Sequence, residues 1–118
     1  MRNRYEDLPA FVTKDGSLVR ELMHPQSHLN EAQSLAEAIV GIGMSTALHR
    51  HLSSEELYHV ASGSGEMMLG DEVFEVSAGD TICILPGIPH SIRNTGEVEL
   101  RILCASSPPY SHEDTELL

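Results

Sequence analysis

From residue 44 to residue 104, short apolar runs alternate with turns rich in glycine and proline. The turns include SGSG, AGD and PGIP, which are strong turn signals. A new run begins about every 8–12 residues, a spacing typical of an all-β sandwich or barrel. We therefore expect strands in the ranges 44–51, 56–61, 66–69, 72–76, 81–85, 90–93 and 98–104.

The two ends of the chain are less regular. Residues 1–16 are polar and end in the turn signal KDG, whereas 17–23 form a short apolar run that predicts a strand. The segment 34–40 is ambiguous, because Ala, Leu and Glu favour a helix but two glycines follow closely. We favour a strand there. The acidic tail, 106–118, is expected to lie on the surface as an extension.

Length and charge limit the range of functions. The chain has 118 residues, the size of one domain, so we expect a single domain over 1–118. The 18 acidic residues outnumber the 7 basic ones, which argues against nucleic acid and against an anionic membrane surface as partners. No apolar run could span a bilayer, and no secretory signal is visible. A cytoplasmic location is the expectation, with Cys83 and Cys104 as buried thiols.

The stretch HRHLSSEELYHVASG, residues 49–63, contains the strongest chemical signal. His49 and His51 lie two apart on a predicted strand, so both side chains point to the same face, about 6–7 Å apart. Either Glu55 or Glu56 can add a carboxylate from the next strand, and strand parity alone does not choose between them. His90, after the PGIP turn, is the best candidate for a further ligand.

An isolated His-x-His pair is common on exposed strands, so this pair alone is weak evidence. The prediction of a metal site depends on the pattern farther along the chain. The remaining histidines fit a shared site less well; these are His24, His28, His59 and His112.

Taken together, these residues resemble the two sequence motifs of the cupin family. The first cupin motif matches here at Gly43, His49, His51, Glu56 and Gly63. The second matches at Gly79, Gly87, His90 and Asn94, with Leu85 at the position where cupins carry proline. The spacing of the first motif selects Glu56 over Glu55. The two motifs span about half of the chain.

The resemblance implies an all-β double-stranded β-helix, the jelly-roll barrel of the cupins. It divides the chain into N-terminal strands at 1–40, a conserved barrel at 41–105 and a tail at 106–118. It also implies that one divalent transition metal lies inside the barrel. Fe, Mn, Ni, Zn and Cu suit such a donor set, whereas Mg and Ca do not. The implied ligands are His49, His51, Glu56 and His90.

The resemblance does not select a reaction, because cupins with this ligand set differ in activity. An Fe(II) oxygenase acting on a small organic substrate is the leading hypothesis. A metal-dependent isomerase or lyase for sugars or sugar phosphates, and a non-catalytic small-molecule binding protein, are the alternatives. In an isomerase or lyase, Tyr58 would act as the catalytic proton donor or acceptor.

Strand parity also predicts which residues line the substrate pocket. It places Ser45, Ala47, Tyr58 and Val60 on the inward face. Two residues elsewhere are candidates for binding an anionic substrate, although exposed positions on strands are the simpler interpretation of both; these are Arg20 and Arg101.

We expect a homodimer. The first 40 residues exceed what one small barrel requires. Strands at 17–23 and 34–40 could therefore extend a sheet onto a second copy.

Overall fold

The computed structural model describes all 118 residues and is almost entirely β-structure, as the turn spacing predicts. A short 3-10 helix, η1 (Tyr5–Asp7), precedes the first strand. The strands are β1 (Ala10–Val12), β2 (Leu18–Met23), β3 (Ser34–Val40), β4 (His49–His51), β5 (Glu55–Ser62), β6 (Ser64–Leu69), β7 (Glu72–Ser77), β8 (Thr81–Ile84), β9 (His90–Asn94), β10 (Leu100–Ser107) and β11 (Thr115–Leu117).

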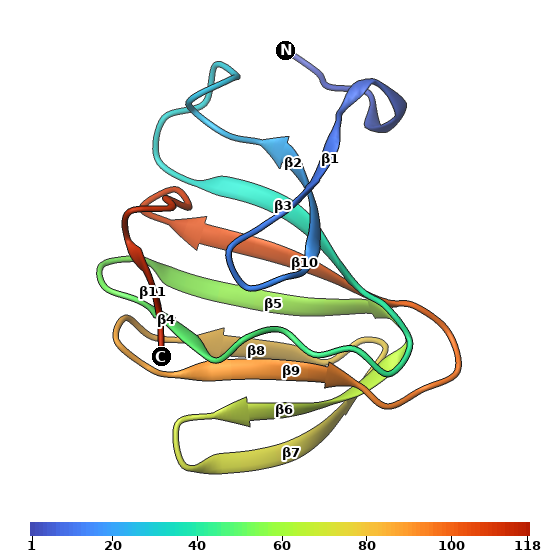
Figure 1. Cartoon of the computed structure of the whole chain (residues 1–118). Helices are drawn as coiled ribbons and strands as arrows, with labels where there is room; N and C mark the ends of the chain where they lie inside the picture. Colours follow the sequence, from blue (N-terminus) through green and yellow to red (C-terminus); the bar gives the residue numbers. More distant parts are fainter.

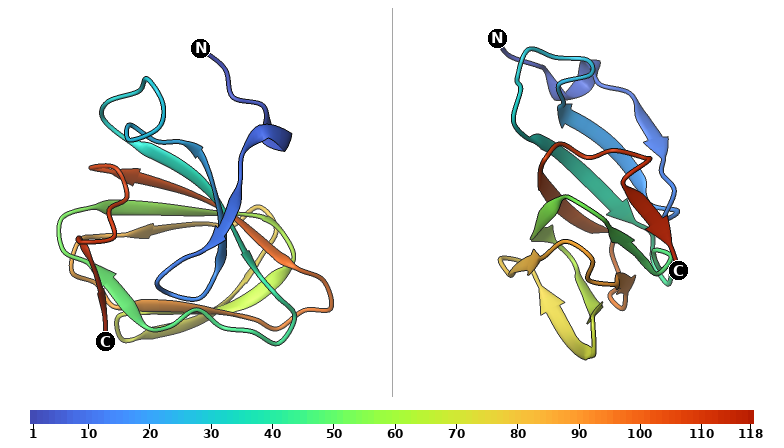
Figure 2. Two further views of the ribbon diagram at one scale, coloured as in Figure 1. Left: turned by 45° about the horizontal axis from the view of Figure 1, so that its top comes forward. Right: turned by 90° about the vertical axis from the view of Figure 1, so that its left-hand side faces the viewer.

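The strands form two antiparallel sheets that face each other across a common interior (Figure 1). One sheet has the order β1-β2-β3-β10-β5-β8, and the other has the order β11-β4-β9-β6-β7. Figure 2 shows the same strands curving around that interior from two further directions. The arrangement is the double-stranded β-helix that the motif resemblance implies. No helix of the structure is long and apolar enough to cross a membrane.

The core of the barrel contains side chains from both sheets. Side chains alternate between solvent and interior along β5 and β10, so every second residue is buried. The fully buried apolar residues come from both sheets and close the interior behind the histidines; they are Met67, Ile84, Ile92, Leu100, Ile102 and Val60. Burying each of these side chains stabilises the fold by about 1.5–3 kcal/mol.

Gly63 is the single residue that connects β5 to β6. Its φ is +89°, and a Cβ built there would lie 2.7 Å from the carbonyl oxygen of Glu99. A side chain is therefore excluded both by backbone conformation and by the close approach of the chain. Gly79 also has a positive φ, but a Cβ there would meet nothing within 4 Å. Gly63 is therefore required both for its backbone conformation and for the close approach of Glu99, whereas Gly79 is required for its conformation alone.

Both ends of the chain contain structure that the sequence pattern did not predict. Ala10–Val12 form β1 on the edge of the larger sheet, within a polar stretch for which no specific strand was predicted. The tail is more than a surface extension, because β11 pairs antiparallel with β4 and aligns Thr115 with His51. Thr115 is buried as a result. The segment TEL is too short to show strand periodicity, so this pairing had no signal in the sequence.

The segment before His49 is not a continuous strand. Ser45 makes only an isolated bridge to Arg93, and regular pairing begins at His49. Ser45 and Ala47 are exposed while Thr46 is buried, so the predicted parity of this segment is wrong. The reason is local. The backbone N–H of Thr46 donates to Ile92 and that of Ala47 donates to Asp15, so successive residues bond to different parts of the chain.

Candidate metal centre

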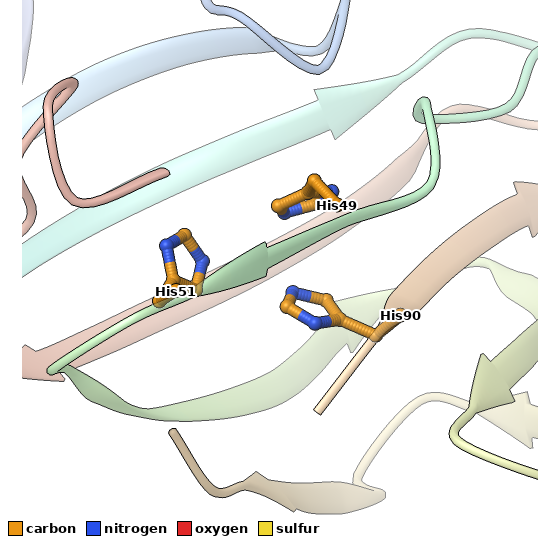
Figure 3. A group of neighbouring side chains, drawn as sticks. All are labelled: His49, His51 and His90. Carbon is orange, nitrogen blue, oxygen red and sulfur yellow. The ribbon is translucent and has the colours of Figure 1, made fainter. Parts of the chain in front are cut away.

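Two neighbouring strands bring three histidines together inside the barrel. His49 and His51 lie on β4, and His90 begins β9 directly opposite His49. All three side chains are buried, and one nitrogen from each lies within 4.8 Å of the others. Figure 3 shows the rings gathered between these two strands. The three histidines that the sequence singled out are therefore positioned to bind one metal ion.

Hydrogen bonds orient all three imidazoles in the same way. Nδ1 of His49 lies 2.8 Å from the carbonyl oxygen of Ala47, and Nδ1 of His90 lies 3.0 Å from that of Ile88. A carbonyl oxygen only accepts, so each Nδ1 carries the proton and donates it. Each Nε2 is then left with a free lone pair, the form that binds metals.

His51 reaches the same tautomer through the C-terminal tail. Its Nδ1 lies 3.1 Å from Oγ1 of Thr115, and that hydroxyl donates its own proton to the carbonyl of Ser111 at 2.9 Å. The hydroxyl must therefore accept from the imidazole, which leaves Nε2 of His51 unprotonated by this network. Such outer hydrogen bonds fix the direction of metal-binding histidines.

Glu56 provides a carboxylate to the same cluster. Its Oε1 lies 3.1 Å from Nε2 of His51 and 3.6 Å from Nε2 of His90, whereas Glu55 is exposed. The parity of β5 thus separates the two glutamates in the way the cupin spacing implies. Ser106 donates a hydrogen bond to the other carboxylate oxygen, 3.4 Å away.

The electrostatics of the cluster favour a bound cation. Burial alone would raise the pKa of Glu56, but His51 and His90 outweigh this effect and lower it to about 2, so the group is a carboxylate. Burial and the charge of His90 lower the pKa of His49. Nε2 of His90 is fully buried and has no hydrogen-bond partner.

A buried lone pair that faces a carboxylate requires a proton or a metal ion between them. For His51 the proton is the simpler occupant: burial opposes its charged form, yet the contact with Glu56 outweighs this and raises its pKa. For His90 no proton position completes a normal hydrogen bond, because the distance to Oε1 is 3.6 Å. Three imidazole nitrogens and one carboxylate suit a first-row transition metal, so the residues fit such an ion.

Asp15 is a second carboxylate at the cluster, and the sequence pattern predicted it only as a turn residue. Its Oδ2 lies 3.6 Å from Nε2 of His49. Its Oδ1 accepts hydrogen bonds from Oγ1 of Thr13 and from both N and Oγ of Ser17, at 2.6–2.9 Å. These bonds hold the carboxylate in place and leave Oδ2 directed at the histidine. A turn aspartate has the same sequence signature whether or not it faces a site.

A small cavity adjoins the histidines, with a volume of about 50 Å³. This is room for a few water molecules or a small organic group. Its walls include Asp15, Glu21, Tyr58 and Tyr110, together with small apolar side chains of β3. Of the four residues predicted to line it, only Tyr58 does so. Ser45 and Ala47 are exposed, and Val60 is buried in the core beyond it.

A wider outer basin of about 690 Å³ continues from the cavity. The two share Thr13, Glu21 and Tyr110, so these residues form the neck between them. The N-terminal turn and the C-terminal tail thus shape the route to the histidines. Neither segment belongs to a cupin motif.

The other residues considered in the sequence do not reach the cavity. Arg20 and Arg101 both form ion pairs with Glu37, so neither is free to bind an anion. His59 is exposed and bonds to Thr81, and His24 bonds through Nε2 to the carbonyl of Tyr110.

The two cysteines differ in their surroundings. Cys104 is buried and lines the cavity, as expected for a small apolar side chain. Cys83 is exposed, contrary to the prediction. The physical reason is that it occupies an outward position of β8, whose residues alternate between solvent and core.

Comparison with known proteins agrees with this fold. The model of the cupin domain family matches residues 37–106. The chain is 53% identical over its whole length to uncharacterized protein MJ1618 of Methanocaldococcus jannaschii, covering 94% of that protein. It is 33% identical over 73% of its length to an oxalate-binding protein of Thermotoga maritima, covering 67% of it. The solved structure of Pac13, a nucleoside dehydratase from Streptomyces, superposes over 100% of this chain and 90% of its own, with a TM-score of 0.81 and 15% identity. The chain belongs to the cupin family.

Proposed function

We propose that the protein is a metal-dependent cupin enzyme that acts on a small organic molecule. His49, His51, His90 and Glu56 would hold one divalent transition metal, with Fe, Mn, Ni, Zn and Cu all suited to the donor set. The observation that carries this proposal is the convergence of three buried imidazoles, with Nε2 of His51 and His90 facing the ionised carboxylate of Glu56 and Nε2 of His49 facing Asp15. When bound, the metal would supply a Lewis acid that polarises an oxygen of the substrate.

The side chains of the cavity support proton transfer, as in an isomerase or lyase. Burial, followed by the charge of Glu56, raises the pKa of Tyr58 well above its ordinary value, so this phenol keeps its proton and can donate a hydrogen bond to a substrate oxygen. Asp15 presents an oxygen that no protein donor occupies. A donor and an acceptor on the same cavity are the parts that a proton transfer next to a carbonyl requires.

Two alternatives rest on their own observations. The ligand set leaves positions open on an octahedral ion, which is also the requirement of an Fe(II) oxygenase. The relative from Thermotoga maritima is named for binding oxalate, which supports a binding protein without turnover. The three functions differ in their need for O₂ and in whether a product forms.

Solvent exchange tests the proton-transfer function directly. Zinc-loaded protein, kept free of oxygen in D₂O, is incubated with small uncharged hydroxyketones such as hydroxyacetone. We expect deuterium to enter at the carbon next to the carbonyl, as seen by ¹H NMR. Tyr58→Phe should slow this exchange about 100-fold, because the proton donor is lost while the metal ligands remain.

The matched control is Tyr5→Phe, since Tyr5 lies half-exposed beside Glu37 and outside the cavity. Its exchange rate should equal that of the wild type. Turnover that requires both iron and O₂ would identify an oxygenase instead. If the protein binds a small molecule saturably but no metal supports deuterium exchange, it is a binding protein without turnover.

We also propose a homodimer, although its contact differs from the one that the sequence pattern predicted. The predicted strands, β2 and β3, are interior to the larger sheet, because β1 covers β2 and β10 covers β3. The free edge at this end is β1, where Phe11 and Val12 are exposed. Light scattering at micromolar concentration should give twice the mass of one chain, and Val12→Lys should shift it toward the monomer. A wild-type mass of 12.9 kDa would refute the dimer.

A further inference from the structure

Apart from the histidines, the ionisable side chains with a charge around the inner cavity are all carboxylates. Three carboxylates line it, those of Asp15, Glu21 and Glu56, and no lysine or arginine does. The metal proposed above would contribute a charge of +2, which does not outweigh three carboxylates. A carboxylate or phosphate entering this cavity would therefore find no uncompensated positive charge.

The basic residues near the cavity are already engaged. Lys14 lies at the outer basin, but its Nζ donates to the carbonyl oxygens of His112 and Thr115, at 3.2 and 2.8 Å. Arg50 follows His49 in sequence, yet it points away and pairs with Glu116. The two bonds hold Lys14 at the outer basin, and the charge of Arg50 is paired with Glu116, so neither side chain lies in the inner cavity beside the histidines.

Two of the three carboxylates present an oxygen without a protein donor. Oε2 of Glu21 is buried at the neck of the cavity and has no hydrogen-bond partner. Oδ2 of Asp15 is likewise left free on the side of His49, because the protein donors all bind Oδ1. A buried acceptor without a donor is unfavourable, so Oε2 of Glu21 favours a ligand that brings O–H or N–H groups. Oδ2 of Asp15 is only partly buried and can accept from the same ligand.

We infer that the cavity selects small uncharged or cationic molecules with O–H or N–H donors, and that Asp15 and Glu21 set this selection against anions. The inference rests on the proposed metal site and narrows its substrate class. Sugar phosphates and short dicarboxylates fall outside that class. Polyhydroxylated, amide and amino-alcohol groups of a few atoms fall inside it, consistent with the cavity of about 50 Å³.

Two probes of equal size, one neutral and one anionic, test this selection. Glycolamide is uncharged and glycolate is an anion, and the two have the same number of non-hydrogen atoms. Both are titrated by calorimetry into zinc-saturated wild type, Asp15→Asn and Glu21→Gln. We expect each variant to bind glycolate at least about fivefold more tightly than the wild type, because one repelling charge is gone. The affinity for glycolamide should not rise and should fall where its O–H or N–H groups donate to the lost carboxylate oxygen, so each variant shifts the ratio of the two affinities toward glycolate.

Glu72→Gln is the matched control, because Glu72 is exposed on β7, away from the cavity. It removes the same charge and should leave both affinities unchanged. A gain of glycolate affinity in one variant alone still supports the selection and assigns it to that residue. If one variant fails to fold, the other carries the test.

Two results would overturn the inference. One is an unchanged glycolate affinity in every folded variant, and the other is a wild-type protein that does not bind glycolamide at millimolar concentration. Zinc content, measured on the same samples, separates this failure from that of the proposed function. Protein without zinc contradicts both, whereas zinc-loaded protein that takes glycolate equally well with and without Asp15 and Glu21 contradicts this inference alone.

Discussion

His90→Ala is expected to lower the affinity for a divalent transition metal by at least about 100-fold, more than the loss of an outer hydrogen bond would. His90 supplies one of three fixed Nε2 lone pairs, and its side chain is fully buried with no other partner for that nitrogen. No other histidine lies near enough to replace it. Wild-type protein purified without chelators should carry near one metal equivalent per chain, and the variant should carry almost none.

The matched control is His59→Ala. His59 is exposed on β5 and bonds to Thr81, so its loss should leave the metal content unchanged. His51→Ala should lose the metal as His90→Ala does, and it should also destabilise the metal-free protein. His51 is the closest partner of the buried Glu56 carboxylate, and a buried charge that loses its partner costs about 3–5 kcal/mol. Full metal content in both His51→Ala and His90→Ala would exclude the proposed site.

The histidines and Glu56 could be predicted from sequence because their positions follow from local rules. His49 and His51 share a face because they are two residues apart on one strand. Glu56 was selected over Glu55 by the spacing of the cupin motif, and the alternation of β5 buries Glu56 and exposes Glu55. His90 was found through the turn that precedes it. The same local rule failed for Ser45 and Ala47, because the chain between Gly43 and His49 pairs with three different segments.

The remainder of the site depends on contacts between distant parts of the chain. Asp15 reaches His49 through the bond between its carbonyl and the N–H of Ala47, at a separation of 32 residues. Thr115 reaches His51 through the pairing of β11 with β4. Neither contact leaves a periodic signal, because each depends on which strand edges meet. The sequence pattern therefore predicted the metal-binding positions but not the residues that shape the mouth of the cavity.

The contact of Thr115 with His51 has a measurable consequence. Thr115→Val should lower metal affinity about 10–100-fold, although Thr115 itself binds no metal. The substitution keeps the shape of the side chain but removes the oxygen that accepts the proton of Nδ1. The ring of His51 then loses the bond that fixes its tautomer and direction, and the freed Nδ1–H lies in a buried position. Competition with a chelator of known affinity gives the metal dissociation constant.

A second measurement separates a loss of His51 orientation from a loss of folding. Cobalt(II) bound to the variant should show an altered visible absorption spectrum, because one imidazole binds at a changed angle, while the cooperative thermal unfolding transition remains. Thr115→Ser should restore both the affinity and the spectrum, since the accepting oxygen returns. Thr81→Val is the matched control, because Thr81 forms the same kind of bond with the exposed His59. If Thr115→Val is folded and binds metal as the wild type does, the tail covers the site without orienting it.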